Sequence, residues 1–259
     1  MRCRRSLPGD GSHPRRSGGA CFYCMNSVLK RLLLVLSCVC PGLFRAYAET
    51  VTWTNTAGGT WSVAANWSPN KVPVAADTAQ ITTPGTYVVT LDSGVSVAQL
   101  QVGATSGTQT FRLTPSGSLT LSGTANFATN APFEWTGGTL AGSGTLNVSG
   151  SLTLSGTGDR SFSGARLNTF GTTTWSGTGR IVGNSSATWQ QSGILNVSAP
   201  SSFVWAGIGG GPVFINSGSA SFTTNFSFSS ASLLTLSSAS ILSLLTLSLS
   251  SLSLLSFSS

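Results

Sequence analysis

Apolar and polar residues alternate in short runs through most of the chain. In TYVVTL at 86–91, TFRLT at 110–114 and GSLTLSG at 117–123, apolar side chains occupy every second position, and Thr and Ser fill most of the others. This period of two is typical of a β-strand that buries one face. Gly, Asn and Pro separate the runs, and no stretch beyond residue 49 has the spacing of an amphipathic helix. The pattern predicts an all-β fold.

The same motifs recur along the chain in the same order. They are GSLTLSG at 117–123 and 150–156, SGTLNV at 143–148 with SGILNV at 192–197, and WTGG at 135–138 with WSGT at 175–178. Strands this short gain a core by stacking turn on turn, in turns of about 20 to 25 residues. We therefore predict a right-handed parallel β-helix over residues 83–226. An antiparallel β-sandwich is the alternative, although the chain has few Asn-Gly or Asp-Gly hairpin turns.

A Trp-rich segment at residues 49–82 precedes the first clear repeat and contains Trp53, Trp61 and Trp67. The first turn of a solenoid exposes an apolar end and unpaired strand edges, which need a cap. We expect these large rings to form that cap, and we expect Asp77 to accept backbone hydrogen bonds in a turn. The alternative is that the rings stack on sugars.

The segment also resembles a known class of proteins. WTNTAGGTWSVAANWSPNKVPVAADTAQI at 53–81, followed by Gly- and Thr-rich repeats, resembles the opening of secreted bacterial adhesins and autotransporter passengers, and the resemblance extends over about 50–225. It implies an extracellular β-helix. It does not imply an activity, and the chain is much shorter than typical members and shows no membrane-barrel translocator.

Four further Trp residues lie within the repeats: Trp135, Trp175, Trp189 and Trp205. We expect them to pack inside the turns or at their corners, as large aromatic residues commonly do. If they instead face outward, they form an aromatic surface. The candidate carbohydrate-binding residues are therefore Trp61, Trp67, Trp135 and Trp175.

The N-terminal part of the chain has the features of a secretion signal. Within residues 25–48, Lys30 and Arg31 precede an apolar run that is too short to span a bilayer, and Ala-Tyr-Ala ends the segment. We predict cleavage before Glu49, with residues 1–24 an upstream extension or a misassigned start. A lipid anchor at Cys38 is the alternative. All five Cys residues precede Glu49, so the mature chain is expected to contain no disulfide.

Charge and catalytic groups are scarce beyond this leader. Eight of the 13 Lys and Arg residues precede Glu49, so the high isoelectric point gives no support to nucleic-acid binding by the folded part. No His or Cys follows Glu49, which excludes Ser-His and Cys-His nucleophile systems, and we expect neither metal nor cofactor. Asp159 beside Arg160, with Arg166 and Arg180 near in sequence, comes closest to the site of a polysaccharide lyase or glycoside hydrolase. We expect an exposed salt bridge there instead.

Residues 227–259 change character, because they contain mostly Ser and Leu and no Gly or charged residue. We predict a low-complexity tail that arises from a shifted or truncated reading frame, and continued strands with an aggregation-prone edge are the alternative. Together the patterns predict an exported, non-catalytic structural or adhesive solenoid at the cell surface or in the medium. Its expected partners are polysaccharide, a host or neighbouring cell surface, or further copies through the solenoid ends. The alternative function is a carbohydrate-binding module.

Overall fold

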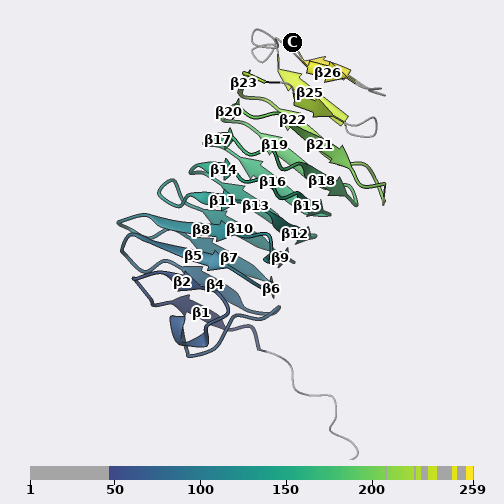
Figure 1. The fold of residues 1–259 in the computed structure, drawn as a ribbon. Helices are drawn as coiled ribbons and strands as arrows, with labels where there is room; N and C mark the ends of the chain where they lie inside the picture. The colour runs from purple at the N-terminus through teal and green to yellow at the C-terminus, as the bar shows by residue number, and fades with distance from the viewer. Residues whose placement is uncertain are drawn as a thin grey trace, which may run out of the picture. The chain divides into compact units, whose positions relative to one another are not determined.

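The computed structural model describes residues 47–207, 209–224, 226–228, 233–237, 247–249 and 255–258. The predicted extension at 1–24 and nearly all of the predicted signal peptide at 25–48 lie outside these residues. The described chain is all-β, with about seven turns of a parallel β-solenoid, and this confirms the predicted fold class (Figure 1). Its one short helix is the 3₁₀ turn η1 (Ala64–Asn66).

Three sheets make up the solenoid, and each turn contributes a strand to each sheet over most of its length. In the described part of the chain, sheet A contains eleven strands. In spatial order from the N-terminal end of the solenoid they are β3 (Trp67–Ser68), β1 (Thr50–Trp53), β4 (Thr78–Ile81), β7 (Gln99–Val102), β10 (Thr124–Phe127), β13 (Thr145–Val148), β16 (Arg166–Thr169), β19 (Thr188–Gln191), β22 (Val213–Asn216), β25 (Leu233–Ser237) and β27 (Leu255–Ser258). The pairings are parallel except for β3 on β1. Parallel pairing therefore begins at β1, within the Trp-rich segment.

The other two sheets follow the same stacking order. Sheet B contains β2 (Gly59–Thr60), β5 (Tyr87–Leu91), β8 (Gln109–Leu113), β11 (Phe133–Trp135), β14 (Leu152–Leu154), β17 (Thr172–Trp175), β20 (Ile194–Val197) and β23 (Ser219–Phe222). Sheet C contains β6 (Gly94–Val97), β9 (Ser118–Leu121), β12 (Gly138–Gly142), β15 (Arg160–Ser163), β18 (Ile181–Asn184), β21 (Ser201–Trp205), β24 (Phe226–Phe228) and β26 (Leu247–Leu249). In the tail, β25, β26 and β27 continue the parallel pairing.

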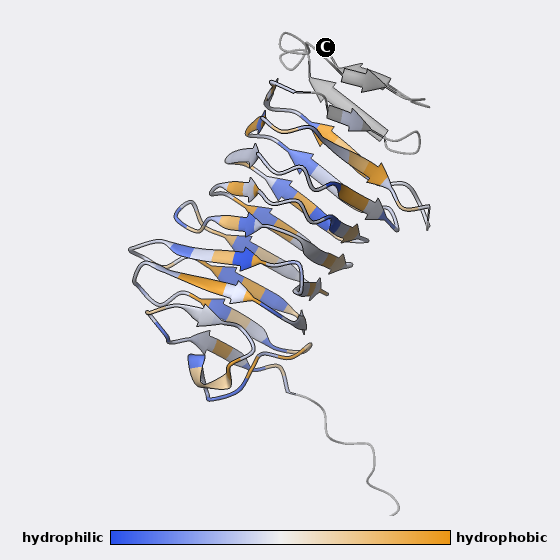
Figure 2. Cartoon of the chain, viewed as in Figure 1, coloured by the Kyte–Doolittle hydropathy of each residue, from blue (hydrophilic) through white to orange (hydrophobic). Residues whose placement is uncertain are grey.

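The alternation read from the sequence places one face of each sheet inside the solenoid. In sheet A one inward column is Ala79, Leu100, Ala125, Leu146, Leu167 and Trp189, all buried and paired in register from turn to turn. A second inward column, two residues further along the strands, includes Ile81, Val102, Phe127 and Val148, which are also buried. The residues between them face outward and are polar, which gives the strands their alternating hydropathy in Figure 2. Because each turn covers the apolar face of the one before, strands of four residues can share a continuous core.

Glycine permits the close approach of successive turns at the corners. Gly142, at the end of β12, has φ +109°, and a Cβ atom there would lie 2.0 Å from the carbonyl oxygen of Leu121 in the previous turn. A side chain at this position would push the two turns apart, so the Gly punctuation in the sequence reflects the stacking itself.

Candidate functional site

The three Trp residues of the N-terminal segment form one buried cluster. Trp53 and Trp61 are fully buried and Trp67 is 2% exposed. The Trp67 ring lies edge-on to both neighbours, with centroids 5.0 Å from Trp53 and 4.5 Å from Trp61, and its Nε1 donates to the Trp61 carbonyl at 2.9 Å. The three rings are buried together in the first turn, which confirms the burial predicted for Trp61 and Trp67.

The other two carbohydrate-binding candidates are also buried. Trp135 and Trp175 have no exposed surface. Trp135 stacks on Phe133 with ring centroids 6.2 Å apart, and Trp175 lies against Trp189 at 6.1 Å. None of the four candidate rings therefore presents a face on which a sugar could stack.

Trp205 lies at a corner, one of the two positions expected for the repeat Trp residues, and 38% of its surface is exposed. It ends β21, where the alternation of that strand gives way to a corner. Its register partner in the previous turn is Gly183.

Asp77 forms the polar part of the cap. Its carboxylate accepts hydrogen bonds from Val74 N at 3.0 Å and Glu49 N at 3.1 Å, and Lys71 Nζ lies 3.1 Å away. Burial raises the pKa of Asp77, but these hydrogen bonds outweigh it and leave the pKa below its usual value. The expectation that Asp77 is a turn acceptor is confirmed.

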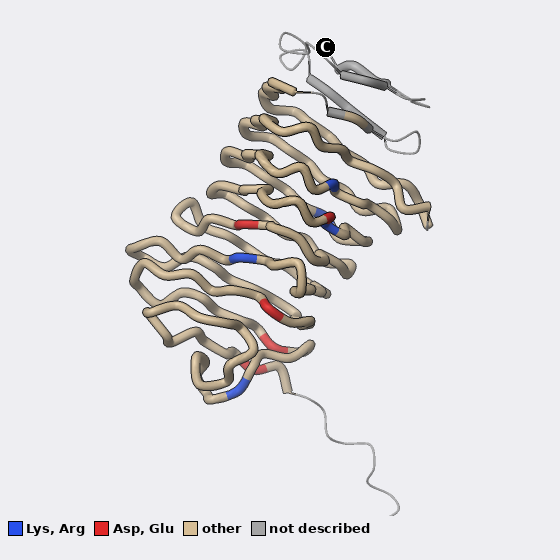
Figure 3. Tube along the Cα trace, viewed as in Figure 1, with Lys and Arg blue, Asp and Glu red and all other residues tan. Residues whose placement is uncertain are grey.

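The remaining acidic residues are spread over the solenoid and not gathered at one site (Figure 3). Asp92 accepts a 2.7 Å hydrogen bond from Ser62 Oγ, and Glu134 Oε2 lies 2.6 Å from Arg112 Nε on the adjacent turn. Asp159 pairs with Arg180, whose Nε lies 3.1 Å from Oδ2, and this hydrogen bonding holds the pKa of Asp159 below its usual value. Both members of that pair are about half exposed, so it is the exposed salt bridge that the sequence predicts.

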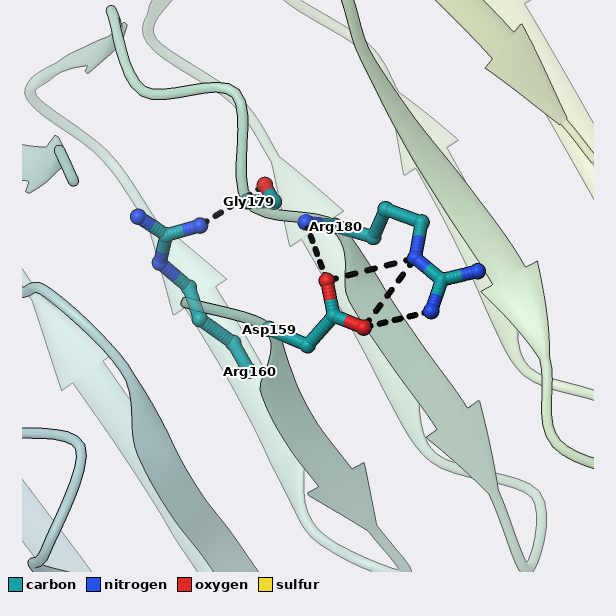
Figure 4. Close-up of polar contacts among 4 residues, drawn as sticks. All are labelled: Asp159, Arg160, Gly179 and Arg180. Atoms are coloured by element: carbon teal, nitrogen blue, oxygen red, sulfur yellow. Dashed lines mark hydrogen bonds and ion pairs between the residues drawn. The ribbon is translucent and has the colours of Figure 1, made fainter. Parts of the chain in front are cut away.

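Arg160 points away from this pair, into the solenoid (Figure 4). It is fully buried and donates to three backbone carbonyls: Trp135 at 2.6 Å, Gly179 at 2.8 Å and Ser155. Burial lowers its pKa to about 10, which still leaves it charged at neutral pH. Arg160 therefore joins neighbouring turns and presents no cation to a substrate.

Two negative findings apply to the part of the chain that the structure describes. No three His, Cys, Asp or Glu side chains come together there as they would around a metal ion. Among the same residues, no helix has the length and apolar character needed to cross a membrane.

The outward face of sheet A carries a column of amide side chains that the sequence analysis missed. In six successive turns the same register position is occupied by Gln80, Gln101, Asn126, Asn147, Asn168 and Gln190. At its centre the amides form a ladder, in which Asn147 Nδ2 donates to Asn126 Oδ1 and Asn168 Nδ2 donates to Asn147 Oδ1, each at 2.9 Å. We call these six residues the amide column.

A shallow groove of about 290 Å³ adjoins the amide column at the end of sheet A where its strands turn into the next corner. Gln101 and Asn126 line it from the column. Thr82, which follows β4, and Ser149, which follows β13, also line it, so the groove extends across four turns. A second groove, of about 330 Å³, lies at the cap between the mainly apolar segment 72–75 and β6.

A sequence signal for the amide column exists in retrospect. Amides occur between two inward residues in AQI at 79–81, LQV at 100–102, ANF at 125–127, LNV at 146–148 and LNT at 167–169. Their alignment depends on the length of each turn, which varies, so the column is evident only once the register is known.

No family model, curated protein or solved structure matches this chain. The fold and the residues just described are therefore the basis for a functional proposal.

Proposed function

We propose that this protein is an exported, non-catalytic β-solenoid that serves a structural or adhesive role outside the cell. The observation that carries the proposal is the distribution of side chains. The four acids Asp77, Asp92, Glu134 and Asp159 lie in separate hydrogen-bonded or ion-paired contacts. The outward positions of the strands are mostly uncharged Ser, Thr, Asn and Gln. Such a surface is compatible with contact and display. Glu49 and Asp77 do lie close together, but both are ion-paired with Lys71, at 2.6 and 3.1 Å, and Asp77 is buried, which favours a structural role for this pair over that of a glycosidase.

Export is supported by the sequence of residues 25–48, with its basic start, apolar run and small residues before Glu49. The mature chain would contain no Cys, so an oxidising environment would not change its covalent structure. The resemblance to adhesins and autotransporter passengers points the same way. The burial of the four candidate Trp side chains removes the basis for a carbohydrate-binding module built on stacking at those residues.

A bead assay separates adhesion from catalysis. Beads coated with the purified full-length protein should be retained on bacterial or host cell layers, and beads coated with the same protein after unfolding in urea should not. The soluble protein should leave a panel of neutral and acidic polysaccharides uncleaved. Turnover of any polysaccharide that is abolished by Asp159→Ala or Glu134→Ala would replace the structural proposal with an enzymatic one.

A further inference from the structure

The outward face of sheet A combines two polar columns with little charge. Beside the amide column runs a second outward column: Thr78, Gln99, Thr124, Thr145, Arg166 and Thr188. Arg166 is the one charged residue in the strands of this sheet. The face therefore repeats hydroxyl and amide groups at the strand spacing of about 4.8 Å.

We propose that this face, with the groove that extends across the turns of β4, β7, β10 and β13, binds a neutral, linear polysaccharide that lies along the stacking direction of the turns. The inference names the partner of the adhesive surface and in that sense rests on the proposed function. The site is distinct from the Trp residues that the sequence suggested, because it binds by hydrogen bonds at an open surface and not by stacking on aromatic rings.

The amide column suits a ligand rich in hydroxyl groups. Each Asn amide has two N–H donors and an oxygen with two lone pairs, and the ladder between Asn126, Asn147 and Asn168 uses one donor and one acceptor between neighbours. Asn126 is exposed and only accepts within the ladder, so the ladder leaves both of its N–H groups available to sugar hydroxyls. The ladder also fixes the orientation of the amides before a ligand arrives, which reduces the entropy lost on binding.

Charge selects the class of polymer. A polyanion such as nucleic acid or an acidic polysaccharide is held by several Lys or Arg side chains, and the strands of this sheet supply Arg166 alone. The strands also contain no Asp or Glu that would attract a polycation. A neutral chain loses the least on this surface, because the polymer itself carries no charge that must be desolvated.

The geometry favours an extended polymer over a small molecule. The groove extends across the four turns of β4, β7, β10 and β13, and its volume of about 290 Å³ is near the lower limit for a pocket that encloses a small ligand. The amide column continues beyond it to Gln190. Weak contacts repeated in each turn can add up along a polymer.

Affinity electrophoresis of the full-length protein tests this inference, with neutral polysaccharides (hydroxyethyl cellulose, mixed-linkage glucan, mannan and arabinoxylan) and acidic ones (polygalacturonate and alginate) in separate gels. At least one neutral polymer should retard the protein. Asn126→Ala and Asn147→Ala should each weaken the retardation about tenfold, as expected for the loss of one or two hydrogen bonds at the surface. Asn196→Ala is the matched control, because Asn147 and Asn196 occupy the same LNV sequence, on sheets A and B respectively.

Far-UV circular dichroism and thermal unfolding should show that all three variants fold. Retardation that is equal in the Asn147→Ala and Asn196→Ala variants would overturn the proposal. So would the absence of retardation by every neutral polymer, or a preference for polygalacturonate. The assay uses purified protein, so a failure of export would refute the proposed function and leave this binding measurable.

Discussion

Replacement of Trp67 by Ala should strongly destabilise the N-terminal end of the solenoid. Trp67 lies between Trp53 and Trp61, and it also belongs to β3, the antiparallel strand that covers the edge of β1. The substitution therefore removes the central ring of the cap and weakens the protection of a strand edge in a single step.

The structure sets the size of the effect. Large-to-Ala changes at buried aromatic residues cost about 3 to 5 kcal/mol. Trp67 also makes two edge-to-face ring contacts, worth about 0.5 to 1.5 kcal/mol each, and a hydrogen bond to the Trp61 carbonyl. We therefore expect a loss near the upper end, about 4 to 5 kcal/mol in the free energy of unfolding. Self-association should rise, because the edge of β1 becomes available to another chain.

Urea unfolding followed by far-UV circular dichroism measures the loss, and sedimentation velocity measures the self-association. Trp205→Ala is the control, since that ring is 38% exposed and lies outside the cap, so its removal should lower the free energy of unfolding clearly less than removal of Trp67 does. A Trp67→Ala protein with unchanged stability and abolished polysaccharide retention would refute the capping role and identify the ring as a sugar platform.

Three further outcomes are expected. Arg160→Met should lower the free energy of unfolding by about 3 kcal/mol or more, because three carbonyls in a buried region lose their donor. Arg180→Met should lower it by less than about 1 kcal/mol, as usual for an exposed ion pair. Chemical denaturation of the two variants measures both losses. Asp77 has a folded-state pKa below its unfolded value of about 3.9. Its contribution to the free energy of unfolding should therefore be complete at pH values well above 4, and it should decline as the pH falls through the folded-state pKa. In a pH series of unfolding free energies, the difference between wild type and Asp77→Asn should therefore shrink on acidification, and a difference that is constant down to pH 2 would contradict the assignment. The full-length protein should release no reducing ends or unsaturated products from neutral or acidic polysaccharides, and sugar-release assays would show otherwise if Asp159 were catalytic.

The fold could be predicted because the two-residue period of β-strands is visible in the sequence itself. Runs such as 86–91 and 117–123 alternate apolar and polar side chains, and the recurrence of short motifs without hairpin signals favours stacking turns over a sandwich. Burial of Trp61 and Trp67 followed from their size and their place before the first repeat. These inferences depend on local pattern alone.

The outward surface could not be predicted in the same way. The amide column depends on which residues of successive turns are aligned, and turns of unequal length hide that alignment in the sequence. The sequence predicts a charged turn at Arg160 because it follows Asp159, yet the strand alternation of β15 directs its side chain inward to backbone carbonyls. The sequence leaves open whether Trp205 lies inside a turn or at a corner, and the structure places it at the end of β21 with 38% of its surface exposed.

The claim that this solenoid works outside the cell is tested most directly by the N-terminus and location of the protein when the complete reading frame is expressed in a bacterial host. Cell fractionation followed by mass spectrometry should find a polypeptide that begins at Glu49, outside the cytoplasm. A cytoplasmic protein that retains Met25 would contradict export, and a form lipidated at Cys38 would replace release by anchoring.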